Sequence, residues 1–290
     1  ALSAVEELAS EMGESVEKAA MGIVQIANNN MIGATRLVLT EKGLDPRDFT
    51  LCAFGGAGPV HVTDLMDLGN IPSGIVPNYP GQFSAFGFTM TDARIDLERT
   101  APMTSRFFDE AYANQVLTDL IKESTDALVG QGYREKIEVF KSLEMRYFGQ
   151  NHELEISLDF DQFGSATIPS IWKGFHDAHK RRYNFEIPGE TIELISIKVT
   201  AVSFTPKPEI PRINQSREEA KPYGNRPVIF DNKVVDTPIF RREELNFGQK
   251  FLGPALIEED ASVSVIRPKM TVAVDEYGNL LIGQIAESMT

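Results

Sequence analysis

The sequence predicts an α/β segment over residues 1–100, an α+β unit over 101–205 and a small all-β domain over 206–290. Three observations predict this combined fold class of α/β and α+β. Helical and strand-like patterns alternate through the first segment, which is typical of an α/β layer. The second segment combines strand-like runs with amphipathic helices. The third contains only short β-rich runs separated by turns.

The composition is that of an ordinary globular protein, and the charge excludes several function classes. Of the 290 residues, 42% are hydrophobic and 24% are charged. The 28 basic residues stand against 42 acidic residues, which gives a net charge of −14. Such a surface repels nucleic-acid phosphates and anionic lipids, and we find no basic run beyond Lys180-Arg181-Arg182. We therefore expect neither a nucleic acid nor a membrane as partner.

The single cysteine, Cys52, excludes an intramolecular disulfide and gives no metal cluster by spacing. Because it lies in an apolar run, we expect it to be a small buried hydrophobic residue. No apolar run reaches the roughly 18 residues of a membrane span, and no signal peptide is recognisable, so we expect a cytoplasmic protein. A helical pattern begins at once after Ala1, so we also expect a piece of a longer protein.

The first segment begins with two predicted helices. A short pattern over residues 2–11 ends at Gly13, and Ser15 occupies the N-cap position of the second helix. This second helix ends at Gly43, a suitable C′ residue. Its apolar residues recur at three-and-four spacing and predict a long, well-buried amphipathic helix: Val16, Ala19, Ala20, Ile23, Ile26, Ala27, Ala34, Leu37 and Val38.

A strand, a glycine-rich turn and a helix follow. The apolar run at residues 49–54 predicts a short buried strand. Next come Gly55-Gly56-Ala57-Gly58-Pro59 and a helical pattern over 60–68, in whose first turn Pro59 fits well. A strand at 75–77 and a helix at 83–90 complete the segment.

The second segment contains longer elements. We expect an amphipathic helix at 107–131, strands at 137–148 and 152–160 with Gly149-Gln150-Asn151 as their turn, a helix at 168–184 and a strand at 191–203. The prolines that follow, Pro206, Pro208 and Pro211, mark a stiff linker.

The third segment consists of short β-rich runs. They lie at residues 228–230, 233–235, 238–241, 255–258, 262–266, 271–274 and 280–282. Asp231-Asn232 and Tyr277-Gly278-Asn279 are suited to hairpin turns between them.

The strongest candidate for a binding site is the glycine turn formed by Gly55, Gly56, Ala57 and Gly58. Glycines let backbone N–H groups approach an anion or a planar ring, and the following helix N-terminus adds a favourable dipole. The turn is not a Walker A loop, since no Lys-Ser or Lys-Thr follows, and it lacks the third glycine of the dinucleotide fingerprint. Alternatively, these glycines only permit tight packing of strand and helix. His61 would either point near the turn or form a local hydrogen bond at the helix start.

Histidines and carboxylates elsewhere give weaker signals. His176 and His179 lie three residues apart on a predicted helix, but no third zinc ligand is recognisable, which favours a solvated polar face. The run Glu258-Glu259-Asp260 fits a solvated turn better than a metal site. The residues by themselves thus predict no metal site.

A series of ordered motifs covers nearly the whole chain. They are Ala19-Ala20-x-Gly22-Ile23-x-x-Ile26-Ala27-Asn28, Asp45-Pro46-Arg47-Asp48-Phe49, the run from Ala53 to His61, Pro80-Gly81-x-x-Ser84-Ala85-x-Gly87, Asp92-x-Arg94, Arg146-Tyr147-x-Gly149-Gln150, Gly253-Pro254-Ala255-x-Ile257-Glu258-Glu259 and Val274-Asp275-x-x-Gly278-Asn279-Leu280. In this order they resemble the C-terminal portion of the hydantoinase A / 5-oxoprolinase family, which is related to the ATP-binding subunits of acetone and acetophenone carboxylases.

The resemblance implies a component of an ATP-dependent hydrolase of cyclic amides, such as hydantoins and 5-oxoproline. It also implies that the first segment is the second-lobe part of an ATPase fold like that of actin, Hsp70 and sugar kinases, where a glycine pair brackets the adenosine. On this basis Gly55, Gly56, Ala57, Gly58 and His61 are the candidate ATP-binding residues, and Mg²⁺ is the implied metal. ATP would phosphorylate the amide oxygen and so activate the amide for hydrolysis.

One part of the family pattern is missing from the sequence. The first phosphate-binding loop, of the Asp-x-Gly-Gly-Thr type, does not occur in it. We therefore expect half an ATP site that is inactive without an N-terminal ATPase half or homologous chain, in a hetero-oligomer with a second hydantoinase-type subunit. The sequence assigns no catalytic residue. Two alternatives stay open, a subunit of an ATP-dependent ketone carboxylase (acetone or acetophenone type) and a non-catalytic assembly subunit or fragment.

Overall fold

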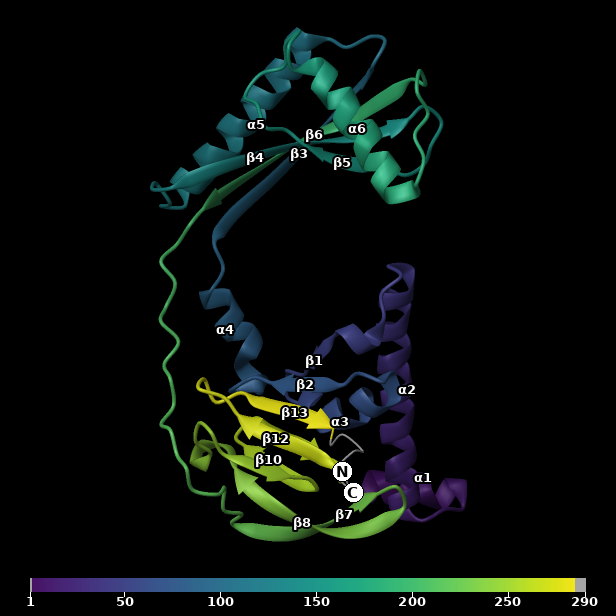
Figure 1. Ribbon diagram of the computed structural model, residues 1–290, viewed down its shortest axis with the longest axis vertical. Coiled ribbons are helices and arrows are strands. Elements are labelled where there is room, and N and C mark those ends of the chain that lie inside the picture. The colour runs from purple at the N-terminus through teal and green to yellow at the C-terminus, as the bar shows by residue number, and fades with distance from the viewer. Residues whose placement is uncertain (1, 285–290) are drawn as a thin grey trace. The chain divides into compact units, whose positions relative to one another are not determined.

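The five-stranded sheet of the protein joins strands from both ends of the chain (Figure 1). The structure, a computed structural model, describes residues 2–284. The strands follow one another in the order β1 (Thr50–Cys52), β2 (Ser73–Val76), β13 (Leu280–Gln284), β12 (Met270–Val274) and β9 (Lys250–Leu252). β1 and β2 are parallel, and the other neighbouring pairs are antiparallel.

This pairing divides the chain into two compact units. Unit 1 contains the residues up to Thr89 and those from Pro208 on, and unit 2 contains Met90–Lys207. The division differs from the three-part prediction, because residues 206–290 share a sheet with residues 1–100 instead of forming a domain of their own. The predicted boundary at residue 100 also falls inside strand β3 (Ala93–Thr104).

The described part of unit 1 carries the helices α1 (Leu2–Met12), α2 (Val16–Glu41), α3 (Gly58–Gly69) and α4 (Phe83–Thr89). Short 3₁₀ turns lie at Pro46–Asp48, Pro80–Gln82 and Arg242–Glu244. The predicted N-cap of α2 is confirmed, because the Ser15 side chain accepts a hydrogen bond from the Lys18 N–H. Across the described residues of both units, no helix is long and apolar enough to cross a membrane.

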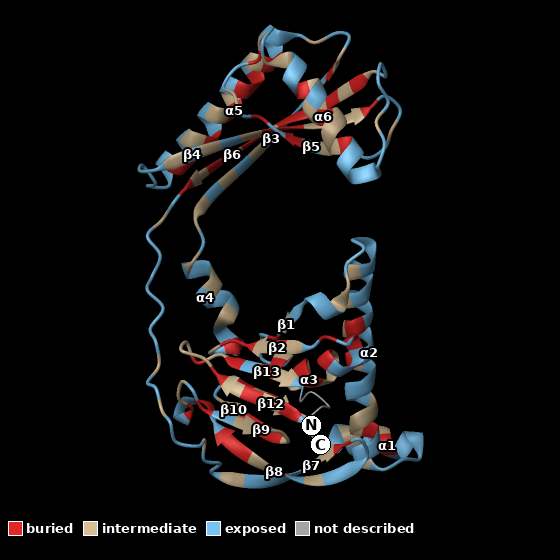
Figure 2. Cartoon of the chain, in the orientation of Figure 1, coloured by how far each residue is buried: buried red, intermediate tan, exposed pale blue. Residues whose placement is uncertain are grey.

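Helix α2 is far less buried than its apolar pattern predicts. Among its residues only Ala19, Asn28 and Ile32 are buried, and Figure 2 shows most of the helix as exposed. Ile26 and Leu37 keep 64% and 60% of their surface accessible. The prediction of a well-buried helix is therefore wrong, although the helix itself is confirmed.

A second sheet of unit 1 has the order β11 (Ser262–Ile266), β10 (Ala255–Glu259), β8 (Lys233–Arg241) and β7 (Gly224–Phe230). β7 and β8 form the hairpin predicted at Asp231-Asn232, where φ is 49° and 62°. Two consecutive left-handed residues are the type I′ arrangement, which suits the twist of a hairpin. The predicted runs 233–235 and 238–241 form one continuous strand, β8.

The core of unit 1 combines side chains of α3 with side chains of both sheets. Its buried members include Val62, Met66, Val76, Phe240, Ala255, Ile257, Ile266, Val272, Leu280 and Ile282. Burying one such side chain contributes about 1.5–3 kcal/mol for the larger residue types. Because the members come from both ends of the chain, neither end can bury its apolar residues alone.

Unit 2 is an antiparallel sheet in the order β3, β6 (Ile192–Ser203), β4 (Ile137–Tyr147) and β5 (Leu154–Ser157), with helices α5 (Glu110–Gly130) and α6 (Ile168–Tyr183). The predicted helices and strands of this segment are confirmed, with ends that shift by a few residues. Strand β3 is not predicted by the sequence. Its charged residues alternate with Ile95 and Leu97, and Pro102 interrupts the pattern.

Candidate functional site

The glycine turn joins β1 to α3, and Gly55 adopts a left-handed backbone conformation. Its φ is 85°, a value that residues with a Cβ rarely adopt. Its N–H donates a hydrogen bond to the Pro80 carbonyl over 2.8 Å. The backbone thus ties the turn at Gly55 to the turn at Pro80-Gly81.

A third turn, between β10 and β11, packs against both of these. A Cβ added to Gly81 would lie 2.6 Å from the Cβ of Ala261. A Cβ added to Gly56 would lie 3.3 Å from the Ala261 carbonyl oxygen. Close packing therefore explains glycine at Gly81 and favours it at Gly56, which supports the packing alternative for Gly56. Motifs that lie far apart in the sequence meet at this point.

Gly58 differs from these glycines because it has room for a side chain. A Cβ there would lie 3.6 Å from the nearest backbone carbon, that of Ala53, which is an ordinary contact. Gly58 is the first residue of α3, and the N-cap residue Ala57 makes no side-chain hydrogen bond to the helix start. No side chain caps the first turn of α3, but Pro59 has no N–H and the Val60 N–H donates to the Ala57 carbonyl over 3.0 Å. The Gly58 N–H, together with the helix dipole, is therefore the group of this turn that can bind an anionic group such as a phosphate.

Aromatic side chains flank the glycine turn, although the sequence analysis does not single them out. The ring of Phe54, next to Gly55, lies 5.3 Å from that of Phe83, which lies 6.3 Å from the ring of Phe86. Phe54 and Phe86 remain 48% and 39% exposed. Exposed rings of this kind can stack on a planar group. Sequence gives no signal for the cluster, because it depends on the hydrogen bond between Gly55 and Pro80.

His61 lies in α3 and bonds to α2, not to a local partner. Its Nδ1 is 2.7 Å from Oδ1 of Asn28, and Nδ2 of Asn28 donates to Oδ2 of Asp64 over 2.8 Å. A carboxylate only accepts hydrogen bonds, so the Asn28 amide must point its NH₂ group at Asp64. The Nδ1 atom of His61 is consequently the donor to Asn28, and the histidine fixes α3 against α2.

Asp64 extends this polar chain to Arg267. The guanidinium of Arg267 donates from Nη1 to Asp64 over 2.7 Å and from Nη2 to Asp231 over 2.6 Å. Burial lowers the pKa of Arg267, but the hydrogen bonds to Asp231 and Asp64 outweigh burial and raise the pKa above its ordinary value. Arg267 therefore stays charged and links the β7–β8 hairpin to α3.

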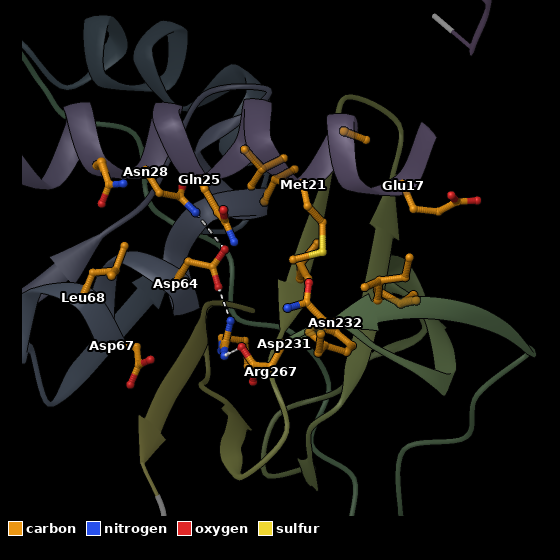
Figure 3. A pocket seen from close by; sticks show the side chains of 18 of the residues that line it. Glu17, Met21, Gln25, Asn28, Asp64, Asp67, Leu68, Asp231, Asn232 and Arg267 are labelled. Carbon is orange, nitrogen blue, oxygen red and sulfur yellow. Dashed lines mark hydrogen bonds and ion pairs between the residues drawn. The ribbon is translucent and has the colours of Figure 1, made fainter. Parts of the chain in front are cut away.

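The polar chain borders a groove of about 890 Å³ within unit 1 (Figure 3). Figure 3 shows side chains of α2 on one side of it, facing those of α3 and of the β7–β8 hairpin. The carboxylates in its lining are those of Glu17, Asp64, Asp67 and Asp231, against the one guanidinium of Arg267. The lining of the groove does not include Gly55, Gly56, Ala57 or Gly58, whereas His61 contacts the lining residue Asn28.

Arg242 is buried in unit 1, with 6% of its surface exposed. Its Nη2 donates to the carbonyl oxygens of Val76 and Pro77 over 3.2 Å each and to that of Gly278 over 2.7 Å. Burial lowers its pKa to about 10. The guanidinium thus holds the end of β2 against the turn between β12 and β13.

Glu259 is half-buried at the end of β10, which contradicts the predicted solvated turn for this residue. Burial raises its pKa, and the charge of Arg242 opposes that rise. Within the described chain, Oε1 of Glu259 and Nη1 of Arg242 are buried without a hydrogen-bond partner. Of the predicted turn, only Asp260 is exposed.

His179 is also buried, with 1% of its surface exposed, so the predicted solvated face is wrong for it. Its Nδ1 is 2.8 Å from the Phe185 carbonyl oxygen, and the ring of Tyr147 packs against it. His176 pairs instead with the Tyr147 hydroxyl over 2.6 Å. In the described part of the chain, no group of three or more His, Cys, Asp or Glu side chains could hold a metal ion.

Cys52 is exposed, contrary to the prediction of a buried residue. It lies in β1, which is an edge strand of its sheet. Partial burial raises the pKa of its thiol, which therefore stays protonated at neutral pH and is a poor nucleophile.

Family models match both halves of the chain. The model described as Hydantoinase/oxoprolinase matches residues 1–97, and the model described as Hydantoinase/oxoprolinase C-terminal domain matches residues 103–282. An uncharacterized protein of Methanocaldococcus jannaschii, MJ0964, is 37% identical over 279 residues, which are 96% of this chain and 40% of that protein. Caprolactamase subunit alpha of Pseudomonas jessenii is 31% identical over 276 residues, 92% of this chain and 40% of its own. The chain thus spans about two fifths of the length of these relatives.

Two solved structures share the fold. Nucleotide-free acetone carboxylase superposes with a TM-score of 0.79 at 24% identity, over 98% of this chain and 42% of that chain. The ATP-dependent caprolactamase of Pseudomonas jessenii superposes with a TM-score of 0.76 at 29% identity, over 98% of this chain and 43% of that chain. The expected fold class, α/β and α+β, is confirmed.

Proposed function

The chain belongs to the hydantoinase/oxoprolinase family, and we propose that it is a component of an ATP-dependent hydrolase of cyclic amides. The observation that carries this proposal is the family match, which includes the glycine turn and α3. One relative is named a caprolactamase subunit, and caprolactam is a cyclic amide.

In the proposed reaction the γ-phosphoryl group of ATP passes to the amide oxygen. A first water attacks the activated carbon, and the ring C–N bond of the tetrahedral intermediate then breaks as the nitrogen takes a proton, which leaves an acyl phosphate. A second water hydrolyses the acyl phosphate to a carboxylate and inorganic phosphate. Positioning and electrostatic stabilisation of the phosphates dominate such a transfer. We assign ATP binding to Gly55, Gly56, Ala57, Gly58 and His61, with the Gly58 N–H at the start of α3 facing an anionic part of the nucleotide.

ATP and Mg²⁺ fit the described residues to different degrees. The open space at the Cβ position of Gly58 and the lack of a side-chain cap at Ala57 are compatible with a nucleotide approaching the backbone. For Mg²⁺, the described residues contain no group of three or more His, Cys, Asp or Glu side chains that could hold a metal ion. The proposal therefore assigns no Mg²⁺ ligand to this chain, and we place the Mg²⁺ site and the first phosphate loop in an N-terminal ATPase half.

The variant Gly58→Ala tests the ATP assignment with little effect on packing. Its methyl group meets only an ordinary contact, so the variant is expected to fold. Reconstituted with an N-terminal ATPase half, the wild-type chain is expected to hydrolyse ATP when hydantoin or 5-oxoproline is added. Gly58→Ala should weaken ATP binding in this complex about tenfold, which corresponds to about 1.4 kcal/mol.

The matched control is Gly130→Ala, since Gly130 is likewise a helical glycine with open space around it but lies in unit 2. It should bind ATP like the wild type. If Gly58→Ala bound ATP as tightly as the wild type, the nucleotide would not bind at this turn. If ATP turnover instead required bicarbonate together with acetone or acetophenone, the complex would be a ketone carboxylase and not a hydrolase.

The partners and the compartment are part of the same proposal. We place the enzyme in the cytoplasm, as a hetero-oligomer with a second hydantoinase-type subunit. Because this chain supplies half a site, calorimetry should detect only weak ATP binding to the chain alone. Micromolar affinity of the chain alone for ATP would contradict the half-site. If the reconstituted complex neither bound nor hydrolysed ATP, a non-catalytic assembly subunit would be favoured.

A further inference from the structure

Tyr79 is an aromatic residue in a left-handed backbone conformation, with φ 53° and ψ 56°. This conformation is strained for most residues with a Cβ, although asparagine and aspartate tolerate it. The other six non-glycine residues with positive φ in the described chain are asparagine, aspartate or lysine. Tyrosine at this position therefore weakens the local backbone, and the reason for it lies in what its side chain does.

The neighbours of Tyr79 hold it in this conformation. The Asn78 N–H donates to Oδ1 of Asn279 over 3.0 Å, and Nδ2 of Asn78 donates to the Tyr277 carbonyl over 3.2 Å. On the other side, the Pro80 carbonyl accepts a hydrogen bond from the glycine turn over 2.8 Å. Strained residues persist where the surrounding structure fixes them in this way, and they concentrate at ligand sites.

Packing within unit 1 does not explain the tyrosine. Tyr79 keeps 67% of its surface exposed. Among residues 2–284 its hydroxyl forms no hydrogen bond and its ring makes no ring contact. A tyrosine that served the core would instead be buried, with a hydrogen-bond partner for its hydroxyl.

The loop that carries Tyr79 adjoins the glycine turn. β1 and β2 are parallel neighbours, and the glycine turn and residues 77–81 follow their carboxyl ends. In open α/β sheets, ligands bind outside the carboxyl ends of the strands. The hydrogen bond from Gly55 to Pro80 joins the two loops directly. A ligand at the glycine turn therefore has the loop of Tyr79 as its neighbour.

The two loops offer different chemistry to such a ligand. The Gly58 N–H can bind an anionic group. The exposed ring of Tyr79 instead offers a flat face on which a planar group can stack. A nucleotide carries both features, because its phosphates and its planar base are different ends of one molecule.

We propose that the base of ATP stacks on the ring of Tyr79, which makes Tyr79 a specificity-determining residue. The inference rests on the proposed function, since it needs ATP at the glycine turn. The stacked ring favours a ligand that carries a base over one that consists of phosphates alone.

The variant Tyr79→Asn tests the ring, because asparagine tolerates the left-handed conformation but has no ring. In the chain alone, relief of the strain should raise the melting temperature by about 2–4 °C. In the complex with an N-terminal ATPase half, Tyr79→Asn should weaken ATP binding about tenfold and leave the affinity for inorganic tripolyphosphate unchanged. Tyr79→Phe keeps the ring and should bind ATP like the wild type.

The matched control is Lys136→Asn, because Lys136 is an exposed residue of unit 2 with φ 52°. This variant should also gain stability, since its backbone strain is relieved in the same way. Its ATP affinity in the complex should be that of the wild type.

Several outcomes would overturn the role of Tyr79. A lower melting temperature of Tyr79→Asn would indicate a structural residue. An equal loss of ATP and tripolyphosphate binding would indicate an effect on the turn and not on the base. If Tyr79→Asn no longer assembled with the ATPase half, the ring would belong to that interface.

Gly58→Ala separates this inference from the proposed function. If Gly58→Ala weakens ATP binding and Tyr79→Asn does not, ATP binds at the turn and only the role of Tyr79 is wrong. If the wild-type complex binds no ATP, both proposals are wrong.

Discussion

Gly56, Gly58 and Gly81 lie close together in the fold but are glycines for different reasons. The close approach of Ala261 requires glycine at Gly81 and favours it at Gly56. Gly58 has room for a methyl group, so packing does not require glycine there. Gly58 is therefore a stronger candidate for contact with a ligand than Gly56.

Replacing Gly81 by alanine is expected to destabilise unit 1. The new Cβ would lie 2.6 Å from that of Ala261, and overpacking of this kind costs about 1–3 kcal/mol. The control is Gly87→Ala in α4, where nothing lies within 4 Å, and alanine should stabilise the helix slightly. Thermal unfolding measures both variants, and equal melting temperatures would contradict the close packing.

Arg242 is expected to be a major structural residue of unit 1. Arg242→Ala leaves the carbonyl groups of Val76, Pro77 and Gly278 without their common donor in a buried region. The loss should be about 3 kcal/mol in the free energy of unfolding. Urea denaturation followed by circular dichroism measures the change, because the single tryptophan, Trp172, lies in unit 2. A loss below about 0.5 kcal/mol, the level of an ordinary surface substitution, would contradict this role.

Glu259 gives a pH-dependent prediction. Burial raises the pKa of its carboxyl above the ordinary value of 4.5, so ionisation weakens the folded state. Below pH 4.5 the group is protonated in the folded and the unfolded chain, and Glu259→Gln should unfold like the wild type. As the pH rises through the raised pKa, the wild type should become less stable than the variant. Melting temperatures from pH 4 to pH 8 measure the difference, about zero at the acid end; a difference that is independent of pH would contradict the raised pKa.

At the scale of elements, the β7–β8 hairpin shows a turn that sequence predicts well. Asp231 and Asn232 both occupy the left-handed region, where Asn and Asp are tolerated and glycine is best. Asn232→Gly should leave the stability unchanged or raise it slightly. Asn232→Val should lower it by about 1–2 kcal/mol, because a β-branched residue is strained there. Chemical denaturation measures whether Asn232→Gly is more stable than Asn232→Val, and equal stability of the two variants would contradict the type I′ turn.

For helix α2, the local sequence pattern predicts the helix ends but not which residues are buried. Its residues predict the N-cap at Ser15 and the end near Gly43, and both are confirmed because capping depends on neighbours in the sequence. The same pattern predicts burial, but it cannot name the partner that buries an apolar face. Ile26 and Leu37, for example, belong to the apolar pattern but stay exposed within the described residues.

At the scale of the whole molecule, the two units should respond differently to truncation. Unit 2 is one continuous stretch with its own core, so residues 90–207 expressed alone are expected to fold. A chain that ends at Lys207 lacks β9, β12 and β13, and its residues 1–89 cannot bury the core of unit 1. Amide hydrogen exchange should then show protection in unit 2 only. Protection of β1, β2 and α3 in the truncated chain would contradict the shared core.

The sequence by itself determined most helices and strands, several caps and turns, and the membership in the hydantoinase/oxoprolinase family. These depend on periodicity, on local hydrogen bonds and on short ordered motifs. It did not determine that residues 1–89 and 208–290 form one unit, that Ala261 packs against two glycine turns, or that His61 is bonded to Asn28. Only the tertiary structure decided these points, because they are contacts between distant residues. Thr63 and Val265, which join α3 to β11, are 202 positions apart, and no local pattern specifies which segments meet over such a distance.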